Sequence, residues 1–446
     1  MNWLLFLILL VITFFNFIVC KKDIMDPTVI VGAVFSLSAF MLCLNYEWGI
    51  QISGMTVAFI SICVFVFSVG CLLGKKINIC KSVREKDTKK KKAFFVTAAE
   101  VMNNLVISRK IFALGSILCI IVTVCFFLRQ YNLSLLLGNT EGIRGIVGTI
   151  RLASRTDPEV FQLGMVLNVG IAFVRAAGYI CIYVVTYKII HKKGKHVKYF
   201  VPIVCLVINS IIATGRGAFI SIVCAILFDI YHVRRMNGDK KVSAKFIKYI
   251  FGGVIVFLVV FWQLGTLTGQ SAVWSLWETL SIYVGSPIIC LDNLLDTGWV
   301  SSTDFGMHTF KGIYSMLKTF GFPVTVVGNH AEMFRWSGYS SNVYTSFFPY
   351  LLDFGIVITI VIQMFLGLII GYVWKCYNEC NTLRLFTGIT YGRFWGSALV
   401  YFSIAERICT NMLALNVFVE IFFYSIFIRF LFKKRKSREA TESIVS

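Results

Sequence analysis

The chain has 446 residues, of which 57% are hydrophobic and only 15% are charged, and its formal net charge is +21. A soluble domain of this length could not bury so much apolar side chain, so the composition excludes an ordinary globular protein. The positive charge does not indicate nucleic-acid binding, because most lysines and arginines flank long apolar runs, where they set topology and contact anionic headgroups.

Repeated apolar runs of membrane-spanning length predict an all-α polytopic membrane protein. The first run is followed by Lys21 and Lys22 and has no positive charge before it. This inverts the pattern of a secretory signal peptide, so we expect a retained first helix with its N-terminus outside. We expect eleven membrane-spanning helices, at residues 2–20, 28–45, 55–74, 111–128, 166–187, 199–213, 217–232, 249–265, 354–374, 387–404 and 412–432.

The predicted organisation has three parts. Residues 1–265 hold the first eight helices, with an arginine-rich outer loop at 129–165 and a Gly-Arg-Gly hairpin tip at 214–217. Residues 266–353 are expected to form a helical extracytoplasmic cap. Residues 354–446 hold the last three helices and a basic tail. Lysine and arginine are concentrated in the loops that this arrangement places inside, which predicts a cytosolic C-terminus.

Arginines on the outer side oppose this charge bias, so we expect a ligand to retain them. A guanidinium group binds phosphate oxygens in a bidentate manner and needs no metal. Arg216 lies between two glycines at a tip joining two short spans of about 15 residues, so it is expected to be recessed below the outer surface. The alternative for each outer arginine is contact with lipid headgroups. The candidates for one outer groove are Arg144, Arg151, Arg155, Arg216 and Arg335.

Two further arginines, Arg175 and Arg393, fall inside predicted spans. A charge there is costly unless it faces a polar cavity or a partner, and Asp353 at the membrane edge is a candidate partner for either. Structural pairing and substrate contact both remain open for them. His330 lies in the polar, aromatic segment before the ninth span and can accept a proton near neutral pH. A purely structural role is its alternative.

Three short motifs and the overall layout resemble the Wzy-type O-antigen and capsule polymerases, a family of oligosaccharide repeat-unit polymerases. The motifs are KKDIMDP at 21–27, TGRGAF at 214–219 and NVYTSFFPYLLDFG at 342–355. The resemblance implies a GT-C-like architecture in a bacterial plasma membrane. It also implies joining of undecaprenyl-diphosphate-linked repeat units on the outer face, with a chain-length regulator and a flippase of the same pathway as partners.

The chemistry that the resemblance implies can be placed on particular residues. Fixed arginines would stabilise the negative charge that grows on the departing diphosphate. Arg216 and Arg335 are assigned to it, with His330 or Asp353 as the base and an inverted anomeric centre as the result. No metal-ligand cluster or nucleotide motif is apparent, so neither a cofactor nor a metal is expected. Supporting substrate contacts are assigned to Arg144, Arg151, Arg155, Arg175, Trp336, Tyr339, Asn342, Tyr344 and Arg393.

Three alternatives differ in the features that they require. An O-antigen ligase-like enzyme would use the same site with a different acceptor. A flippase or transporter of lipid-linked glycans would favour inverted repeats and polar residues near the membrane midplane, and no repeat is apparent. A scaffold protein would not need arginine at a recessed hairpin tip.

Overall fold

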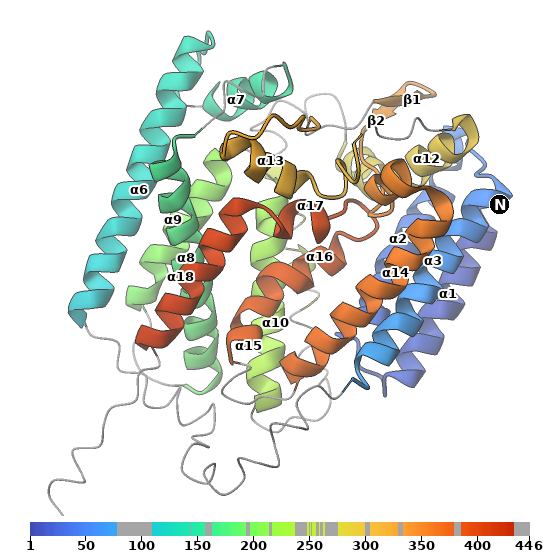
Figure 1. The fold of residues 1–446 in the computed structure, drawn as a ribbon, viewed down its shortest axis with the longest axis horizontal. Helices are drawn as coiled ribbons and strands as arrows, with labels where there is room; N and C mark the ends of the chain where they lie inside the picture. The colour runs from blue at the N-terminus through green and yellow to red at the C-terminus, as the bar shows by residue number, and fades with distance from the viewer. Residues whose placement is uncertain are drawn as a thin grey trace, which may run out of the picture.

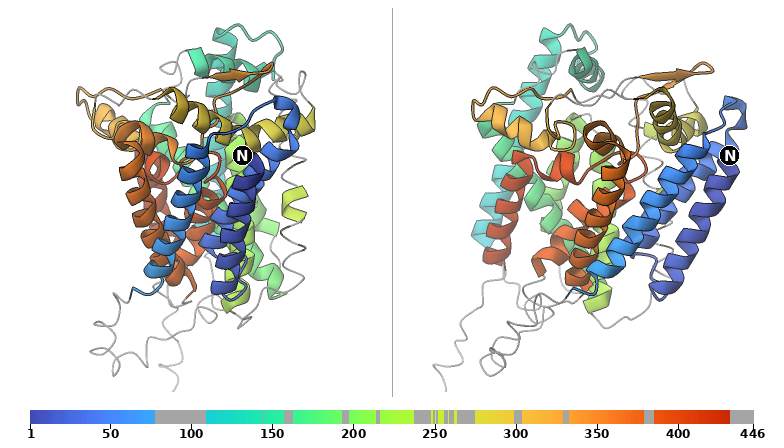
Figure 2. Two further views of the ribbon diagram at one scale, coloured as in Figure 1. Left: turned by 90° about the vertical axis from the view of Figure 1, so that its right-hand side faces the viewer. Right: turned by 45° about the vertical axis from the view of Figure 1, so that its right-hand side comes forward.

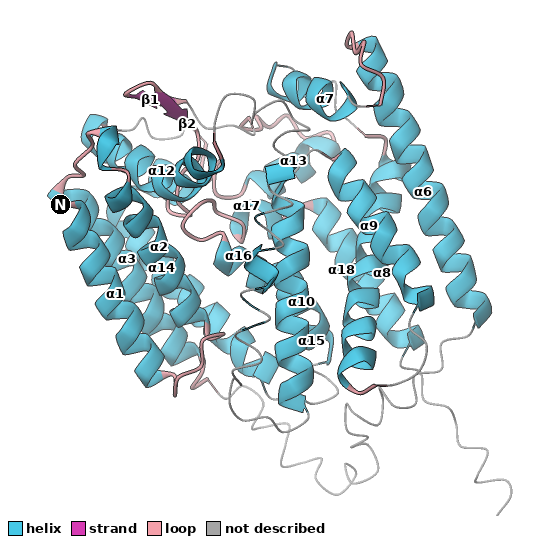
Figure 3. Cartoon of the chain, turned by 180° about the vertical axis from the view of Figure 1, so that it is seen from behind, coloured by secondary structure: helices cyan, strands magenta, loops and turns pink. Residues whose placement is uncertain are grey.

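The computed structural model describes residues 1–77, 109–143, 145–156, 163–192, 197–213, 216–236, 248, 250, 252–255, 258, 262–263, 275–298, 304–328, 333–378 and 385–431. The chain is mainly helical, and Figures 1 and 3 show two groups of long helices on either side of α10 (Arg216–Met236).

The first group contains α1 (Asn2–Val19), α2 (Pro27–Leu44) and α3 (Gly54–Gly74), with the 3-10 turn η1 (Tyr46–Trp48) between α2 and α3. Helix α2 begins where the sequence favours it, because Pro27 stands in the first turn and the Asp26 carboxylate accepts the Thr28 N–H. Lys75, after α3, forms an ion pair with the same carboxylate and ties the two helix ends together.

Helix α14 (Phe348–Asn378) packs closely against α3 through interlocking glycines. A Cβ atom on Gly70 would meet the Met364 carbonyl oxygen at 2.2 Å, and one on Gly371 would meet the Cys71 carbonyl oxygen at 2.1 Å. The pairs Gly70/Gly74 and Gly367/Gly371 are each four residues apart, as in the small-residue contacts of membrane helices. The first turns of α14 are offset by a kink at Gly355, whose φ of 74° suits glycine.

The second group contains α6, α8, α9 and α18. Its apolar core is separate from that of the first group and is formed mainly by α8, α9 and α18 together with α10. Between the two groups, α15, η6 and α16 form one broken helix in which η6 is a π-helical turn, and α17 follows after a loop. The bounds are α6 (Arg109–Leu136), α7 (Gly145–Thr156), α8 (Met165–Ile190), η4 (Val197–Tyr199), α9 (Phe200–Ile212), α15 (Leu385–Tyr391), η6 (Gly392–Gly396), α16 (Ser397–Val400), α17 (Cys409–Met412) and α18 (Leu415–Leu431).

The predicted cap gathers at one end of the helices, at the top of Figures 1 and 2. It contains α12 (Leu276–Thr297), α13 (Lys311–Thr319) and an antiparallel hairpin of β1 (Phe334–Trp336) and β2 (Tyr339–Ser341). Helix α13 lies directly on the backbone near α17, because Gly312 has no side chain to hold it away. This contact joins the cap to the membrane-embedded part.

Seven of the described helices are long and apolar enough to cross a membrane, namely α1, α2, α3, α6, α8, α10 and α14. The chain is therefore a multi-pass helical membrane protein. Of the other predicted spans, 199–213 and 412–432 correspond to the shorter helices α9 and α18, and 387–404 is the broken helix. The predicted span 249–265 lies largely outside the described residues.

Candidate functional site

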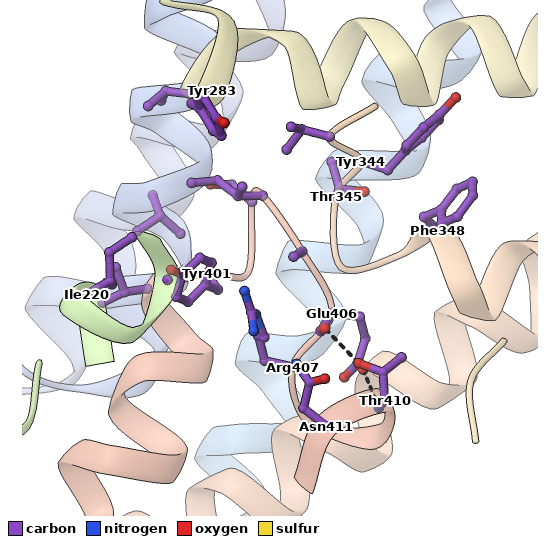
Figure 4. A pocket seen from close by; sticks show the side chains of 18 of the residues that line it. Ile220, Tyr283, Tyr344, Thr345, Phe348, Tyr401, Glu406, Arg407, Thr410 and Asn411 are labelled. Atoms are coloured by element: carbon purple, nitrogen blue, oxygen red, sulfur yellow. Dashed lines mark hydrogen bonds between the residues drawn. The ribbon is translucent and has the colours of Figure 1, made fainter. Parts of the chain in front are cut away.

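Two cavities open near the cap end of the helices. The larger one has a volume of about 1650 Å³. Its walls come from α2, α10, α12, α13 and the segments at 342–349 and 400–414. Polar and aromatic side chains gather around Arg407 in this cavity, as Figure 4 shows. The apolar part is lined by residues that include Ile30, Val34, Leu37, Ile220, Val223 and Leu227.

The smaller one, the arginine cavity, has a volume of about 400 Å³ and lies among α8, α9, α10, η6 and the start of α18. The described residues that line it include Arg175, Arg393 and Arg407 but no acidic residue. Asn209 also lines it, and this residue is 4% exposed, with no hydrogen-bond partner for either amide atom among the described residues. Such a wall presents positive charge and hydrogen-bond donors to an anion.

The two cavities share part of their walls, formed by Gly217, Tyr401, Arg407, Asn411 and Ala414. The Arg407 guanidinium lies 4.4 Å from the centre of the Tyr401 ring, and the buried Nε has no partner among the described residues. Gly217 permits this arrangement, because a Cβ atom there would lie 2.7 Å from the Tyr401 hydroxyl and 3.1 Å from Arg407 Nη2.

Gly217 is also the second residue of α10, so the helix begins at the shared wall. The N–H groups of its first turn and the positive end of its dipole therefore add to the charge of the arginines there. The side chain of Arg216 itself lies outside the described residues.

The carboxylate of Glu406 fixes the loop that carries Arg407. It accepts hydrogen bonds from the Tyr350 hydroxyl at 2.8 Å and from the backbone N–H groups of Ile408, Cys409 and Thr410 at 2.7–2.8 Å. These donors occupy both carboxylate oxygens. Glu406 therefore orients its neighbour instead of accepting a proton from a substrate.

The π-helical turn η6 carries Arg393, which forms an ion pair with Glu420 of α18 at 3.1 Å. Glu420 is completely buried and also attracts Arg175 electrostatically. The expectation that Asp353 would pair with one of these arginines is wrong for Arg393, because Glu420 takes that place. One carboxylate thus faces two guanidinium groups, which leaves positive charge at the cavity.

Asp353 instead organises the segment before α13. Its two oxygens accept the backbone N–H groups of His308 at 3.3 Å and Thr309 at 2.6 Å. His308 lines the larger cavity, and burial lowers the pKa of its imidazole, while Asp353 opposes this shift. Lys311 lines the same cavity, and burial lowers its pKa to about 8. His308 is therefore a neutral imidazole at pH 7, suited to accept a proton.

The residues expected from the sequence divide into three groups. Arg175 and Arg393 line the arginine cavity, whereas Asn342 and Tyr344 line the larger cavity. Arg335 is exposed on the β1–β2 hairpin and lines neither cavity. Arg144 and His330 lie outside the described residues, as do the side chains of Arg151 and Arg155 on α7.

Trp336 and Tyr339 pack away from both cavities. Their rings lie 5.6 Å and 5.8 Å from the ring of the buried Trp48, and the Ser337 hydroxyl donates to the Trp48 carbonyl. These contacts attach the hairpin to the first helix group. The substrate contacts expected of these two rings therefore have no support from their positions, since neither ring lines one of the two cavities.

Sequence reasoning missed Arg407, Tyr401, Asn209 and His308 as site residues. Arg407 also lies in a loop that the charge bias places outside, so the sequence contained the same indication for Arg407 as for the other outer arginines. Within the described part of the chain, no group of three His, Cys, Asp or Glu side chains has the arrangement of a metal site. Comparison of the chain with protein-family models, curated proteins and solved structures finds no match.

Proposed function

We propose that this protein is a glycosyltransferase that polymerises lipid-diphosphate-linked oligosaccharide repeat units at the outer face of a bacterial plasma membrane. The observation that carries the proposal is the shared wall between the two cavities. There, the arginine cavity, which has the size of a headgroup, meets the larger cavity, which has a polar, aromatic end and a candidate base. Because we assign the oligosaccharide to the larger cavity, we call it the glycan cavity.

The charge arrangement fits the chemistry of the leaving group. Breaking a bond between a sugar and a diphosphate places additional negative charge on the departing oxygen. Arg175 is attracted by the buried Glu420, Arg393 forms an ion pair with the same carboxylate, and Arg407 is held against the Tyr401 ring, so their charge needs little rearrangement during the reaction. The resemblance to repeat-unit polymerases supplies the substrate class, undecaprenyl diphosphate carrying a short glycan.

The acceptor side fits as well. His308 faces the glycan cavity as a neutral base and can take the proton from an acceptor hydroxyl. A single displacement of this kind inverts the anomeric centre. The base proposed here is thus His308, in place of Asp353, whose oxygens are occupied by backbone N–H groups.

The test uses purified full-length protein in detergent with lipid-linked repeat units, without nucleotide sugar. We expect a ladder of glycan lengths on a gel. Absence of a ladder, with transfer of finished polymer to a different acceptor, would instead indicate a ligase. Movement of the lipid across proteoliposome membranes without any new glycosidic bond would indicate a flippase.

A further inference from the structure

We propose that the two cavities separate the two lipid-linked substrates of the reaction. The arginine cavity holds the diphosphate of the donor lipid, and the glycan cavity holds the oligosaccharide of the acceptor, so the two lipids approach different faces of α10. This inference rests on the proposed function and assigns its two substrates to defined places.

Size separates the two ligands. A cavity of about 400 Å³ lies at the lower end of the range for small-molecule sites and accommodates a diphosphate with the first part of its lipid chain. The glycan cavity, at about 1650 Å³, is large enough for several sugar rings. An acceptor reacts at the end of its glycan that lies away from its diphosphate, so it needs the larger space.

Charge supports the same assignment. The described residues lining the arginine cavity include three arginines and no carboxylate, and Asn209 presents an unpartnered buried amide. A buried amide without a partner is costly, and a phosphate oxygen would satisfy its N–H groups. The glycan cavity has a mixed wall, which includes Glu406 and Asn342 beside Lys311 and suits neutral sugars with many hydroxyl groups.

Each cavity also has its own apolar side for a prenyl chain. In the arginine cavity this side is formed by Phe126 of α6, Ile171 of α8 and Leu206 of α9. In the glycan cavity it is formed by α2 and by a different face of α10, at Ile220, Val223 and Leu227. The residues of α10 that line the arginine cavity, Ala218 and Ser221, lie on another side of the helix, as its 3.6-residue period requires.

The reacting atoms then meet at the shared wall beside Tyr401 and Arg407. The acceptor hydroxyl oxygen forms a bond to the anomeric carbon of the donor glycan, and the bond from that carbon to the phosphate oxygen breaks. The electron pair of the broken bond leaves with the diphosphate, toward the arginines. The proton of the hydroxyl passes to His308, which lines only the glycan cavity.

The experiment measures binding, not turnover. Isothermal titration calorimetry with detergent-solubilised full-length protein uses farnesyl diphosphate as a short-chain probe for the donor headgroup and inorganic diphosphate as the anion without a tail. Arg175→Gln tests the arginine cavity, and Arg175→Lys tests whether a positive charge restores binding. Ile220→Trp fills part of the glycan cavity, and Arg335→Gln removes an exposed arginine outside both cavities as the matched control.

We expect Arg175→Gln to weaken farnesyl diphosphate binding at least tenfold, Arg175→Lys to recover part of the affinity, and the other two variants to bind as the parent does. In the ladder assay, Ile220→Trp should raise the KM for the lipid-linked repeat unit. If Ile220→Trp weakens farnesyl diphosphate binding and Arg175→Gln does not, the assignment of the donor is overturned. If inorganic diphosphate binds as tightly as farnesyl diphosphate, the apolar side of the arginine cavity does not bind the prenyl chain, and that part of the proposal is overturned.

These outcomes also separate this inference from the proposed function. Selective loss of farnesyl diphosphate binding in Arg175→Gln, without a ladder from any repeat unit, would support the donor site and contradict polymerisation. A ladder that is unchanged in Arg175→Gln would support polymerisation and contradict the donor site. Size-exclusion elution of each variant at the position of the parent protein establishes that it is folded.

Discussion

Arg407 is the residue on which the site depends most directly. It lines both cavities, it is held against Tyr401, and no carboxylate of the described chain is paired with it. Its Nε atom is buried and has no partner among the described residues, which is unfavourable unless a ligand accepts that hydrogen bond. The position of Arg407 thus favours an anionic substrate over a purely structural role.

Replacement of Arg407 by glutamine should lower kcat about 10²- to 10³-fold, the usual effect of removing one fixed group that stabilises charge in a transition state. Arg407→Lys should retain more activity, because it keeps the charge but loses the bidentate geometry. Ladder formation measured over time in detergent checks this. Arg335→Gln is the matched control, and an equal loss of activity in that variant would contradict the placement of the site.

His308 gives the activity a defined dependence on pH. Burial lowers the pKa of its imidazole below the ordinary value of 6.5, so the neutral form persists at pH 6.5 and below. The midpoint of the acidic decline in rate, where the imidazole becomes protonated, should therefore lie below pH 6.5. The measurement is the pH profile of kcat/KM. His308→Gln should be slow at every pH and should lack this acidic decline; a profile identical to that of the parent protein would rule out His308 as the base.

At the scale of single residues, the sequence could predict the types of side chain but not all of their positions. Arg175 and Arg393 were identifiable because a charge in an apolar run requires a polar surrounding. The charge bias places Arg335, which stands in an aromatic run, among the outer arginines expected in the site. That run forms the β1–β2 hairpin, whose aromatic rings pack against Trp48. Trp48 and the hairpin are almost 300 positions apart in the sequence, so no local pattern predicts this contact.

Among the elements, the pairing of α3 with α14 illustrates a contact that sequence spacing could have suggested. The glycines at 70 and 74 and at 367 and 371 have the four-residue spacing of close membrane-helix contacts. Each pair lies on one face of its helix, and the backbones approach so closely that any side chain would collide. What the spacing alone does not specify is which helix is the partner.

Gly371→Leu should destabilise the protein by roughly 1–3 kcal/mol or more, because the new side chain would collide with the Cys71 backbone, which cannot move aside easily. The thermal unfolding midpoint in detergent measures this effect. Gly115→Leu on α6 is a suitable control, since a Cβ atom there has open space around it. Equal midpoints for the two variants would show that the close packing of α3 and α14 does not contribute to stability.

Gly217 has a different role from these packing glycines. An added methyl group would displace Tyr401 and Arg407, whose side-chain ends can move, and so should cost little stability. We expect Gly217→Ala to reduce the rate of ladder formation while leaving the thermal unfolding midpoint within about 2 °C of the parent value. A variant with unchanged activity would indicate that the shared wall tolerates a shift of Arg407.

For the whole molecule, the arrangement of helix ends agrees with the charge pattern of the sequence. Helices α3, α8, α10 and α18 all end at the side of the bundle opposite the cap, where the lysine-rich segments follow in the sequence (Figure 1). The sequence could therefore predict the general layout from composition and charge alone. It could not predict how the second group of helices leaves a cavity against the first, because that depends on packing between distant segments.

The orientation in the membrane is open to direct measurement. A short epitope tag inserted after Gly49, an exposed position in the turn between α2 and α3, should be accessible to antibody in intact spheroplasts. A tag inserted after Lys192, at the end of α8, should react only after the membrane is permeabilised. The opposite pattern would invert the topology and place the cap in the cytosol, where the proposed reaction would not occur.

The π-helical turn at Gly392–Gly396 carries a consequence for how this chain tolerates deletions. Such a turn contains one residue more than the regular helix needs. Removal of Gly392 would thus restore regular α-helical hydrogen bonding, but it would rotate the residues before the π-helical turn by about 100° relative to those after it. The guanidinium of Arg393 would then turn away from Glu420. The deletion variant would therefore have a more regular helix but would lose this ion pair.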